Sequence, residues 1–127
     1  MIKTGEMLIT IKNAHAANKR TVSVPYSTFK YELAKILEKK GLVEEVQKRG
    51  RLKKKIVIKL KYEDNKPRIH DIRMISKSGR RIYLKSKDLF PPKSGYGILI
   101  VSTSKGLLTS EKAKKMNLGG EAICEIW

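Results

Sequence analysis

Three hydroxyl side chains, a lysine and a glycine follow one another directly after an apolar run. They are Ser102, Thr103, Ser104, Lys105 and Gly106. Hydroxyl and ammonium groups bind phosphates, riboses and base edges, and a glycine lets another backbone or a base approach closely. The composition fits two interpretations equally well, a loop that contacts RNA and a polar turn that leads into a capped helix.

A second group combines two guanidinium groups with an aromatic ring. Arg80, Arg81 and Tyr83 follow a predicted turn at Ser78–Gly79. Arginine pairs with phosphate, and an aromatic ring stacks on an unpaired base. In a charged hairpin the ring would face the core instead. From the pattern alone we favour the core position for Tyr83 and RNA contact for the two arginines.

A third group is a run of basic residues in and beside one predicted hairpin loop. Its members are Lys48, Arg49, Arg51, Lys53, Lys54 and Lys55. Like charges this close repel one another unless solvent or a polyanion screens them. We interpret the run as a phosphate-binding surface without sequence preference, with Lys54 and Lys55 as candidate RNA contacts. A merely solvated loop is the alternative.

The sequence lacks the usual signatures of catalysis and of metal binding. It has no nucleophile elbow, P-loop or zinc-protease motif, and Gly95–Gly97 lacks the third glycine of a dinucleotide fingerprint. No spacing connects His15 or His70 to a nucleophile, so we interpret both as ordinary helix or strand residues. The single cysteine, Cys124, has no neighbours spaced for a zinc site. We expect no enzymatic activity, metal or other cofactor.

One carboxylate stands beside a pair of glycines, where Glu121 follows Gly119 and Gly120. A carboxylate can act as a general base, but a lone one at a turn more often orients its neighbours through hydrogen bonds. We interpret Glu121 as a support for the loop at residues 102–106. The two glycines are assigned to the same binding surface.

The charge of the chain points to a polyanionic partner. Its 127 residues include 29 basic and 12 acidic side chains, a net charge of +17, and 40% of the residues are hydrophobic. The apolar content is that of a folded protein, and so large a charge of one sign is relieved when phosphates neutralise it. Residues 1–66 and residues 67–127 are both strongly basic, so the charge is not confined to a tail.

Targeting signals are not evident in the sequence. The first residues lack the apolar stretch of a secretory signal, and no segment has the length of a membrane span. With one cysteine, the chain forms no internal disulfide, which fits a reducing compartment. We therefore expect a soluble, intracellular protein.

Apolar periodicity predicts the elements of the first half. The spacing of Met7, Leu8, Ile11 and Ala14 predicts a helix from Glu6 to about Ala17, with Thr4 as a candidate N-cap. Alternation predicts a strand over residues 21–24, which Pro25 ends.

The next predicted helix has local signals at both ends. Ser27 is the expected N-cap, Tyr26 and Tyr31 have the spacing of a hydrophobic staple, and Gly41 supplies the left-handed end. The residues that we expect this helix to bury are Phe29, Leu33, Ile36 and Leu37.

An antiparallel pair of strands should follow. It spans residues 42–46 and 54–62, around a basic loop at residues 47–53, and one face of the second strand is cationic while the other carries Ile56, Ile58 and Leu60. The polar segment Glu63–Pro67 has the composition of a connection. We therefore place a domain boundary between residues 66 and 67.

The second half is predicted to be mostly β. Expected strands cover residues 69–75, 81–84, 98–101 and 121–127, and Pro91 and Pro92 interrupt the regular structure between them. Thr109 can cap a short helix with Glu111 in its first turn.

Several of these segments together resemble a known family. The segments Gly97–Gly106 (GILIVSTSKG) and Leu118–Cys124 (LGGEAIC) closely resemble the signature of bacterial-type small-subunit ribosomal protein eight. The family usually has an aspartate at Glu6, a Thr-Arg pair at residues 9–10 and a proline at Ser78. Further matches in the same order are Met7–Leu8, Ile11–Ala14 with Asn13, Val24–Ser27, Lys30 and Gly79–Tyr83.

The resemblance implies an α+β fold in two parts. These are an N-terminal α-β-α-β-β half at residues 1–66 and a mostly β C-terminal half at residues 67–127 with a short helix, which is the order that periodicity gives. It also implies a primary assembly protein that binds an irregular helix in the central domain of small-subunit ribosomal RNA. Ser102, Thr103 and Ser104 would contact an adenine and its backbone.

The resemblance extends the expected partners and contacts. Asn13, Lys30 and Tyr83 join the candidate RNA-binding residues. Neighbouring small-subunit ribosomal proteins are expected partners, and some members of the family also repress their own operon mRNA. We expect a monomer within a cytoplasmic ribosome, with no membrane contact, and an organellar ribosome remains an open alternative.

Three rival functions from other classes remain open at this point. An RNA-modifying or nucleotide-hydrolysing enzyme would use Glu121 or Ser104 and would turn over excess substrate. An adaptor for acidic proteins would keep its partners after RNase treatment. A DNA architectural protein would prefer duplex DNA to structured RNA in competition.

Overall fold

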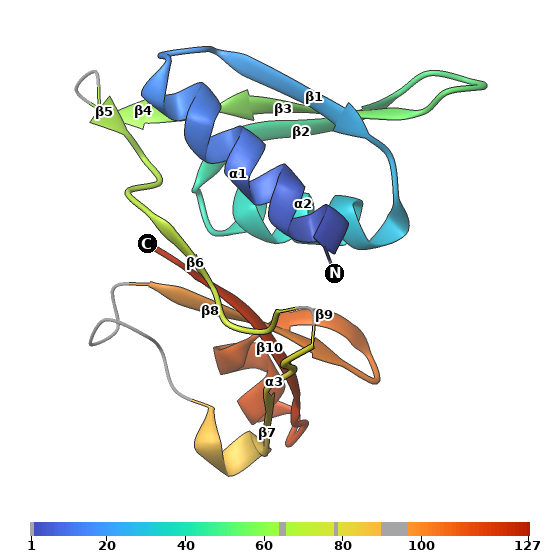
Figure 1. The fold of residues 1–127 in the computed structure, drawn as a ribbon, viewed down its shortest axis with the longest axis vertical. Coiled ribbons are helices and arrows are strands. Elements are labelled where there is room, and N and C mark those ends of the chain that lie inside the picture. The colour runs from blue at the N-terminus through green and yellow to red at the C-terminus, as the bar shows by residue number, and fades with distance from the viewer. Residues whose placement is uncertain (1, 64–65, 78, 90–96) are drawn as a thin grey trace. The chain divides into compact units, whose positions relative to one another are not determined.

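The computed structural model describes residues 2–63, 66–77, 79–89 and 97–127. They form two compact units, Lys3–His70 and Asp71–Trp127, the second of which also includes Ile2. The division falls after His70, whereas the composition of Glu63–Pro67 pointed to residue 66. Helices and antiparallel sheets occur together, which confirms the α+β class (Figure 1).

The first unit contains two helices and five short strands. Their bounds are α1 (Ile2–Ala16), β1 (Thr21–Pro25), α2 (Thr28–Lys39), β2 (Val43–Arg49), β3 (Lys55–Leu60), β4 (Tyr62–Glu63) and β5 (Lys66–Pro67). Thr4 lies inside α1, so its predicted role as the N-cap is wrong. The apolar periodicity begins only at Met7 and carries no information on the turn before it. Among the described residues, no helix has the length and hydropathy that crossing a membrane requires.

A three-stranded antiparallel sheet in the order β1-β3-β2 forms the core of this unit. Val22 pairs with Ile58, and Val46 pairs with Ile58 from the other side. Ile58 is fully buried while Lys55 and Lys59 are exposed, so the predicted division into an apolar and a cationic face is confirmed. The β2–β3 pairing continues to Arg49, and the hairpin loop is therefore shorter than predicted.

Helix α2 packs against β2 and has the predicted ends (Figure 1). The Lys30 N–H donates to the Ser27 hydroxyl at 3.2 Å, the rings of Tyr26 and Tyr31 are 5.8 Å apart, and Gly41 has a φ of 73°. The burial prediction is only half correct, because Leu33 and Leu37 are buried as expected but the other two buried positions differ from the predicted ones. Buried residues are Lys30, Leu33, Ala34 and Leu37, whereas Phe29 and Ile36 are half-buried.

His15 is buried on α1, with 3% of its surface exposed. Its ring contacts Tyr62 edge-on, with the centroids 5.2 Å apart, and neither ring nitrogen has a hydrogen-bond partner among the described residues. Burial lowers the pKa of His15, and the backbone of Ile69 offsets only part of that effect. The first unit therefore keeps a neutral imidazole in its interior.

We expect the free energy of unfolding to fall as the pH drops below 6.5, the ordinary pKa of histidine. The unfolded chain protonates His15 near that value and the folded chain only at lower pH, so between the two pKa values the unfolded state binds more protons. Urea denaturation across pH measures this. His15→Phe should flatten the dependence, and His70→Phe, which changes an exposed histidine, should not. The reverse pattern would contradict the assignment.

The second unit is mostly β, as predicted. Its elements are β6 (Ile72–Met74), β7 (Tyr83–Leu84), a 3-10 turn (Ser86–Asp88), β8 (Ile98–Thr103), β9 (Gly106–Thr109), α3 (Ser110–Lys115) and β10 (Gly120–Ile126). The sheet order is β6-β10-β8-β9, and β7 also pairs with β10. Predicted strands exist at each expected position, but β6 and β7 are shorter than expected. Some residues named in the sequence predictions lie outside the described residues: they are Ser78, Pro91 and Pro92, and Gly95 and Tyr96 of the Gly95–Gly97 fragment.

The core of this unit lies between the sheet and α3. Its buried members are Leu89, Leu99, Val101, Leu108, Ala113 and Ala122. The Lys112 N–H donates to the Thr109 hydroxyl at 3.3 Å, which confirms the predicted cap. Strand β9 was not predicted, since four residues are too few for a periodicity to show.

Candidate nucleic-acid interface

Ser102 to Gly106 belong to the β8–β9 hairpin and do not form a separate loop. Ser102 and Thr103 end β8, Gly106 begins β9, and only Ser104 and Lys105 form the turn between them. Gly106 has a φ of 99°, the left-handed conformation that a glycine adopts after a tight turn. The hairpin therefore presents Ser104 and Lys105, both exposed, at its tip.

The three hydroxyl groups of the hairpin differ in their availability. The Thr103 hydroxyl donates to the Gly106 carbonyl at 2.8 Å and accepts from the Lys105 N–H at 3.1 Å. Its one proton is therefore used within the turn. Ser102 is half-buried in the sheet, so Ser104 is the hydroxyl that most readily meets a ligand.

A row of three side chains crosses the sheet next to this hairpin. Glu121 on β10 pairs with Ser102 on β8 and with Tyr83 on β7. Residues directly opposite one another in antiparallel strands project to the same face. The Ser102–Glu121–Tyr83 row therefore places a hydroxyl, a carboxylate and a phenol on one surface, although Tyr83, Ser102 and Glu121 lie 19 positions apart from one to the next in the sequence.

The core position favoured for Tyr83 is wrong, because 70% of this residue is exposed. Its neighbour Leu84 packs against the core of the second unit. Since successive strand residues face opposite ways, Tyr83 must face outward. An exposed aromatic ring beside a basic residue is suited to stacking on a base.

Glu121 contacts Arg81, not the hairpin that we expected it to support. Arg81 Nη1 lies 3.3 Å from Glu121 Oε2, and the Glu121 side chain is 11% exposed. Among the described residues, Arg81 provides the side-chain hydrogen bond of this carboxylate. Glu121 therefore orients a guanidinium group, and it supports Ser102 only through the pairing of β10 with β8.

Gly119 and Gly120 allow the strands of this site to approach closely. A Cβ on Gly120 would overlap the Ser102 carbonyl oxygen, and a Cβ on Gly119 would lie 2.5 Å from the Leu84 carbonyl oxygen. No side chain fits at either position without a backbone shift. The glycines predicted as RNA contacts thus hold β10 against the strands that carry Ser102 and Tyr83.

The structure separates the two adjacent arginines. Arg81 lies with Glu121, whereas Arg80 lines a different hollow together with Ile82. Lys77 and Arg80 close the turn before them, each donating its N–H to the carbonyl of the other at 2.9 Å. Only Arg81 therefore belongs to the surface that carries Tyr83.

Comparison with known proteins identifies a family. A sequence model of the family described as Ribosomal protein S8 matches residues 3–127. The chain belongs to the ribosomal protein S8 family. It is a ribosomal protein and not an enzyme, as the sequence predicted.

Three relatives show how far the similarity to the S8 family extends. The chain is 42% identical to small ribosomal subunit protein uS8 of Mycoplasmopsis pulmonis, over 96% of this chain and 93% of that protein. Identity to the uS8 protein of Oleidesulfovibrio alaskensis is 45%, over 96% and 94%. Identity to that of Persephonella marina is 42%, over 96% and 95%.

The remaining candidates of this S8-family chain lie in the first unit. Asn13 is exposed on α1, and Lys54 and Lys55 are exposed at the start of β3. Lys30, by contrast, is only 8% exposed on α2, which leaves little of it for a ligand. Asn13, Lys54 and Lys55 are therefore accessible to RNA, whereas Lys30 is mostly covered.

The β2–β3 hairpin of the S8-family chain also holds lysines over aromatic rings. Lys48 Nζ lies 5.0 Å from the centroid of the Tyr26 ring and 5.8 Å from that of Tyr31, and Lys54 Nζ lies 5.9 Å from Tyr26. Cations at this distance are attracted to the ring faces. The spacing of the two tyrosines predicts only a hydrophobic staple, and the basic run predicts only the cations of this contact.

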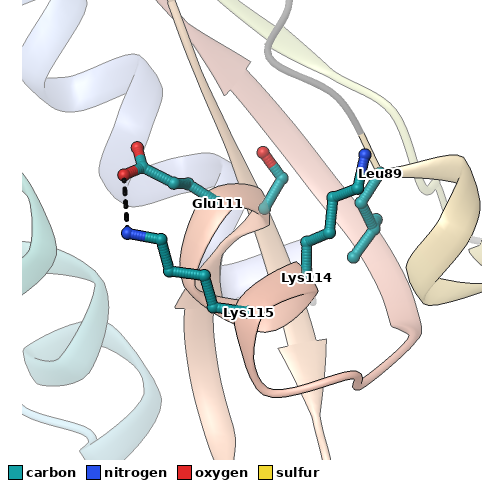
Figure 2. Close-up of a pocket in the computed structure, with 5 residues that line it drawn as sticks. Leu89, Glu111, Lys114 and Lys115 are labelled. Carbon is teal, nitrogen blue, oxygen red and sulfur yellow. Dashed lines mark ion pairs between the residues drawn. The ribbon is translucent and has the colours of Figure 1, made fainter.

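A hollow of about 510 Å³ beside α3 offers no catalytic arrangement (Figure 2). Glu111 and Lys115 form an ion pair of 3.6 Å at its edge, and Lys114 and Leu89 lie on its other side. Among the described residues that line the hollow, Ser110 supplies the hydroxyl and is buried, and none is a histidine. The groups needed to activate a nucleophile are therefore not gathered here.

The single thiol is protected in the interior. Cys124 is fully buried, and burial raises its pKa to about 12. Within the described ranges, no three His, Cys, Asp or Glu side chains are grouped as metal ligands. The chemistry available at the surface of this S8-family chain is that of cations, hydroxyls and aromatic rings.

Proposed function

We propose that this protein is a structural constituent of the small ribosomal subunit and binds the central domain of small-subunit ribosomal RNA directly. In this proposal it is a primary binder, and the RNA that it holds serves later assembly partners. Its membership of the ribosomal protein S8 family supports the proposal, as do the names of its relatives. The net charge of +17 supports a polyanionic partner.

One observation carries the proposal at the level of the site. The exposed Tyr83 ring lies on β7, just after Arg81, whose guanidinium binds Glu121 on β10. The Ser104–Lys105 tip follows β8, and β10 pairs with both β7 and β8. An irregular RNA helix offers unpaired bases that can stack on an aromatic ring, next to phosphates and riboses that accept hydrogen bonds. This combination suits a non-helical nucleotide better than a regular duplex.

Each group of the site has a separate role in this proposal. Tyr83 stacks on an unpaired base, and the Ser104 hydroxyl bonds the base edge or the backbone beside it. Arg81 has five N–H donors, so one can bind Glu121 while others meet a phosphate. Lys105 at the tip and the exposed lysines of the β2–β3 hairpin add affinity that depends on salt.

We further propose the wider setting of this binding. The protein is expected to act as a monomer inside the ribosome, in the cytoplasm, with neighbouring small-subunit ribosomal proteins as partners. Its own operon mRNA is a second RNA ligand if that mRNA carries a mimic of the ribosomal site.

Binding assays with three nucleic acids test the proposal. We expect a central-domain fragment of small-subunit ribosomal RNA to bind more tightly than an arbitrary structured RNA or duplex DNA at moderate ionic strength. A footprint should fall on an irregular helix. Equal affinity for all three nucleic acids would refute specific recognition and leave a general polyanion binder.

Ser104→Ala should weaken the central-domain complex by about 1–3 kcal/mol, because the RNA group that met the hydroxyl loses its partner. The salt dependence should stay nearly unchanged, since no charge is removed. Fluorescence anisotropy with the cognate and the arbitrary RNA measures both. Ser23→Ala, which removes an exposed hydroxyl from β1, is the matched control and should bind normally. Equal losses on both RNAs would count against a specific contact.

A further inference from the structure

A second hollow of the second unit gathers three cations around an apolar floor. Its volume is about 510 Å³, and it is lined by Arg73, Met74, Ile75, Lys77, Arg80 and Ile82. We call it the Arg73 hollow. Neither Arg73 nor Lys77 was singled out by sequence, and Arg80 was grouped with Arg81 and Tyr83.

The cations of the Arg73 hollow are not held in ion pairs by the part of the chain that the structure describes. Among the residues that the structure describes, Arg73, Lys77 and Arg80 form no ion pair, and all three are exposed. Glu125 lies opposite Arg73 in the pairing of β10 with β6, yet no ion pair joins them. By contrast, Lys115 beside the hollow at α3 is already paired with Glu111.

The backbone around these cations is firmly held. Lys77 and Arg80 exchange two hydrogen bonds of 2.9 Å, and Gly79 between them has a φ of 83°. The Ser76 hydroxyl, which is buried, accepts from the Ile82 N–H at 3.0 Å and ties the two arms of this turn together. The backbone from which Lys77 and Arg80 extend is therefore set before any ligand binds, which reduces the backbone entropy lost on binding.

The floor of the Arg73 hollow adds an apolar surface to the charge. Met74, Ile75 and Ile82 line it and are half-buried. A carboxylate or an inorganic anion would use only the cations. A nucleotide would use both parts, because its phosphate needs cations while its sugar and base offer apolar surface.

We propose that the Arg73 hollow binds one nucleotide of an RNA strand. Arg73, Lys77 and Arg80 hold its phosphate, and its sugar lies against Met74, Ile75 and Ile82. The site is distinct from the surface of Tyr83, because Arg80 and Ile82 alternate with Arg81 and Tyr83 along one extended segment. The inference rests on the proposed function only in taking the ligand to be RNA. An acidic protein partner is the other outcome of the test.

The first arm of the test measures salt dependence on both the central-domain RNA and the arbitrary structured RNA. Arg73→Gln and Lys77→Gln should each reduce the slope of log K against log salt by about 0.7, the contribution of one phosphate contact. Lys112→Gln, an exposed lysine of α3 outside the hollow, should change it much less. Glu125→Gln should not lower the slope as Arg73→Gln does. If Arg73 served mainly to pair with Glu125, the two substitutions would have the same effect on the slope.

The second arm locates the RNA beside the hollow. Because Cys124 is buried and its pKa is raised to about 12, an iron chelate attached to Lys77→Cys labels one position only. We expect hydroxyl-radical cuts in the bound RNA, at nucleotides different from those cut from Ser104→Cys.

The two arms keep this inference separate from the proposed function. Slopes that fall in both glutamine variants, together with cuts from Lys77→Cys, support the hollow even if the central-domain RNA is not preferred. Unchanged slopes in both variants, or no cuts from Lys77→Cys in the formed complex, overturn it. An acidic protein would then be the better candidate for this hollow.

Discussion

Gly120→Ala is expected to lower the free energy of unfolding of the second unit by about 1–3 kcal/mol, the usual cost of overpacking. The new Cβ would overlap the Ser102 carbonyl oxygen and would push β10 away from β8. The Ser102–Glu121–Tyr83 row would open, so RNA affinity should fall as well. Hydrogen exchange of the β8 and β10 amides, with anisotropy on central-domain RNA, measures both effects.

Gly79→Ala is the matched control for this substitution. No atom lies within 4 Å of a Cβ at Gly79, but its φ of 83° strains any other residue. We expect only local backbone strain of about 1–2 kcal/mol, with the β8–β10 amides protected as before. If Gly120→Ala left exchange at β8 unchanged, the close approach of the strands would not be what this glycine provides.

Tyr83→Ala is expected to weaken RNA binding by about 1–3 kcal/mol, the contribution of one stacked base. Tyr83 is 70% exposed as a residue, so the loss of its ring should leave the free energy of unfolding nearly unchanged. Titration of central-domain RNA and denaturation of the free protein test the two statements together.

Tyr83→Phe separates stacking from hydrogen bonding. It keeps the ring and removes only the hydroxyl, so we expect it to bind almost as the unchanged protein does. Equal losses in the alanine and phenylalanine variants would assign the contact to the hydroxyl group. A large fall in unfolding free energy in Tyr83→Ala would show that the ring is needed for folding instead.

Features set by neighbours in the sequence were predicted well. The N-cap at Ser27 and the left-handed glycine at Gly41 depend on a few adjacent residues. Likewise, the alternation in β3 follows directly from a period of two along one strand. The order of elements also followed from the periodicity of the separate segments, and the family motifs imply the same order.

Features set by pairing across the sheet were predicted less well. The direction of Tyr83 depends on how β7 joins β10, and Arg81 finds Glu121 40 residues away. Periodicity within a segment of two to four residues cannot show which face will be covered. For the same reason the sequence grouped Arg80 with Arg81, and interpreted Gly119 and Gly120 as a surface rather than as a point of close contact.

The alternation of Arg80, Arg81, Ile82 and Tyr83 makes this segment intolerant of a change in length. Inserting or deleting a single residue between the Lys77 turn and β7 would turn the side chains of β7 to the opposite face. Tyr83 would then point inward where Leu84 now packs, and the guanidinium that meets Glu121 would point away from it. Point substitutions here should be tolerated far better than frame-preserving indels of one codon.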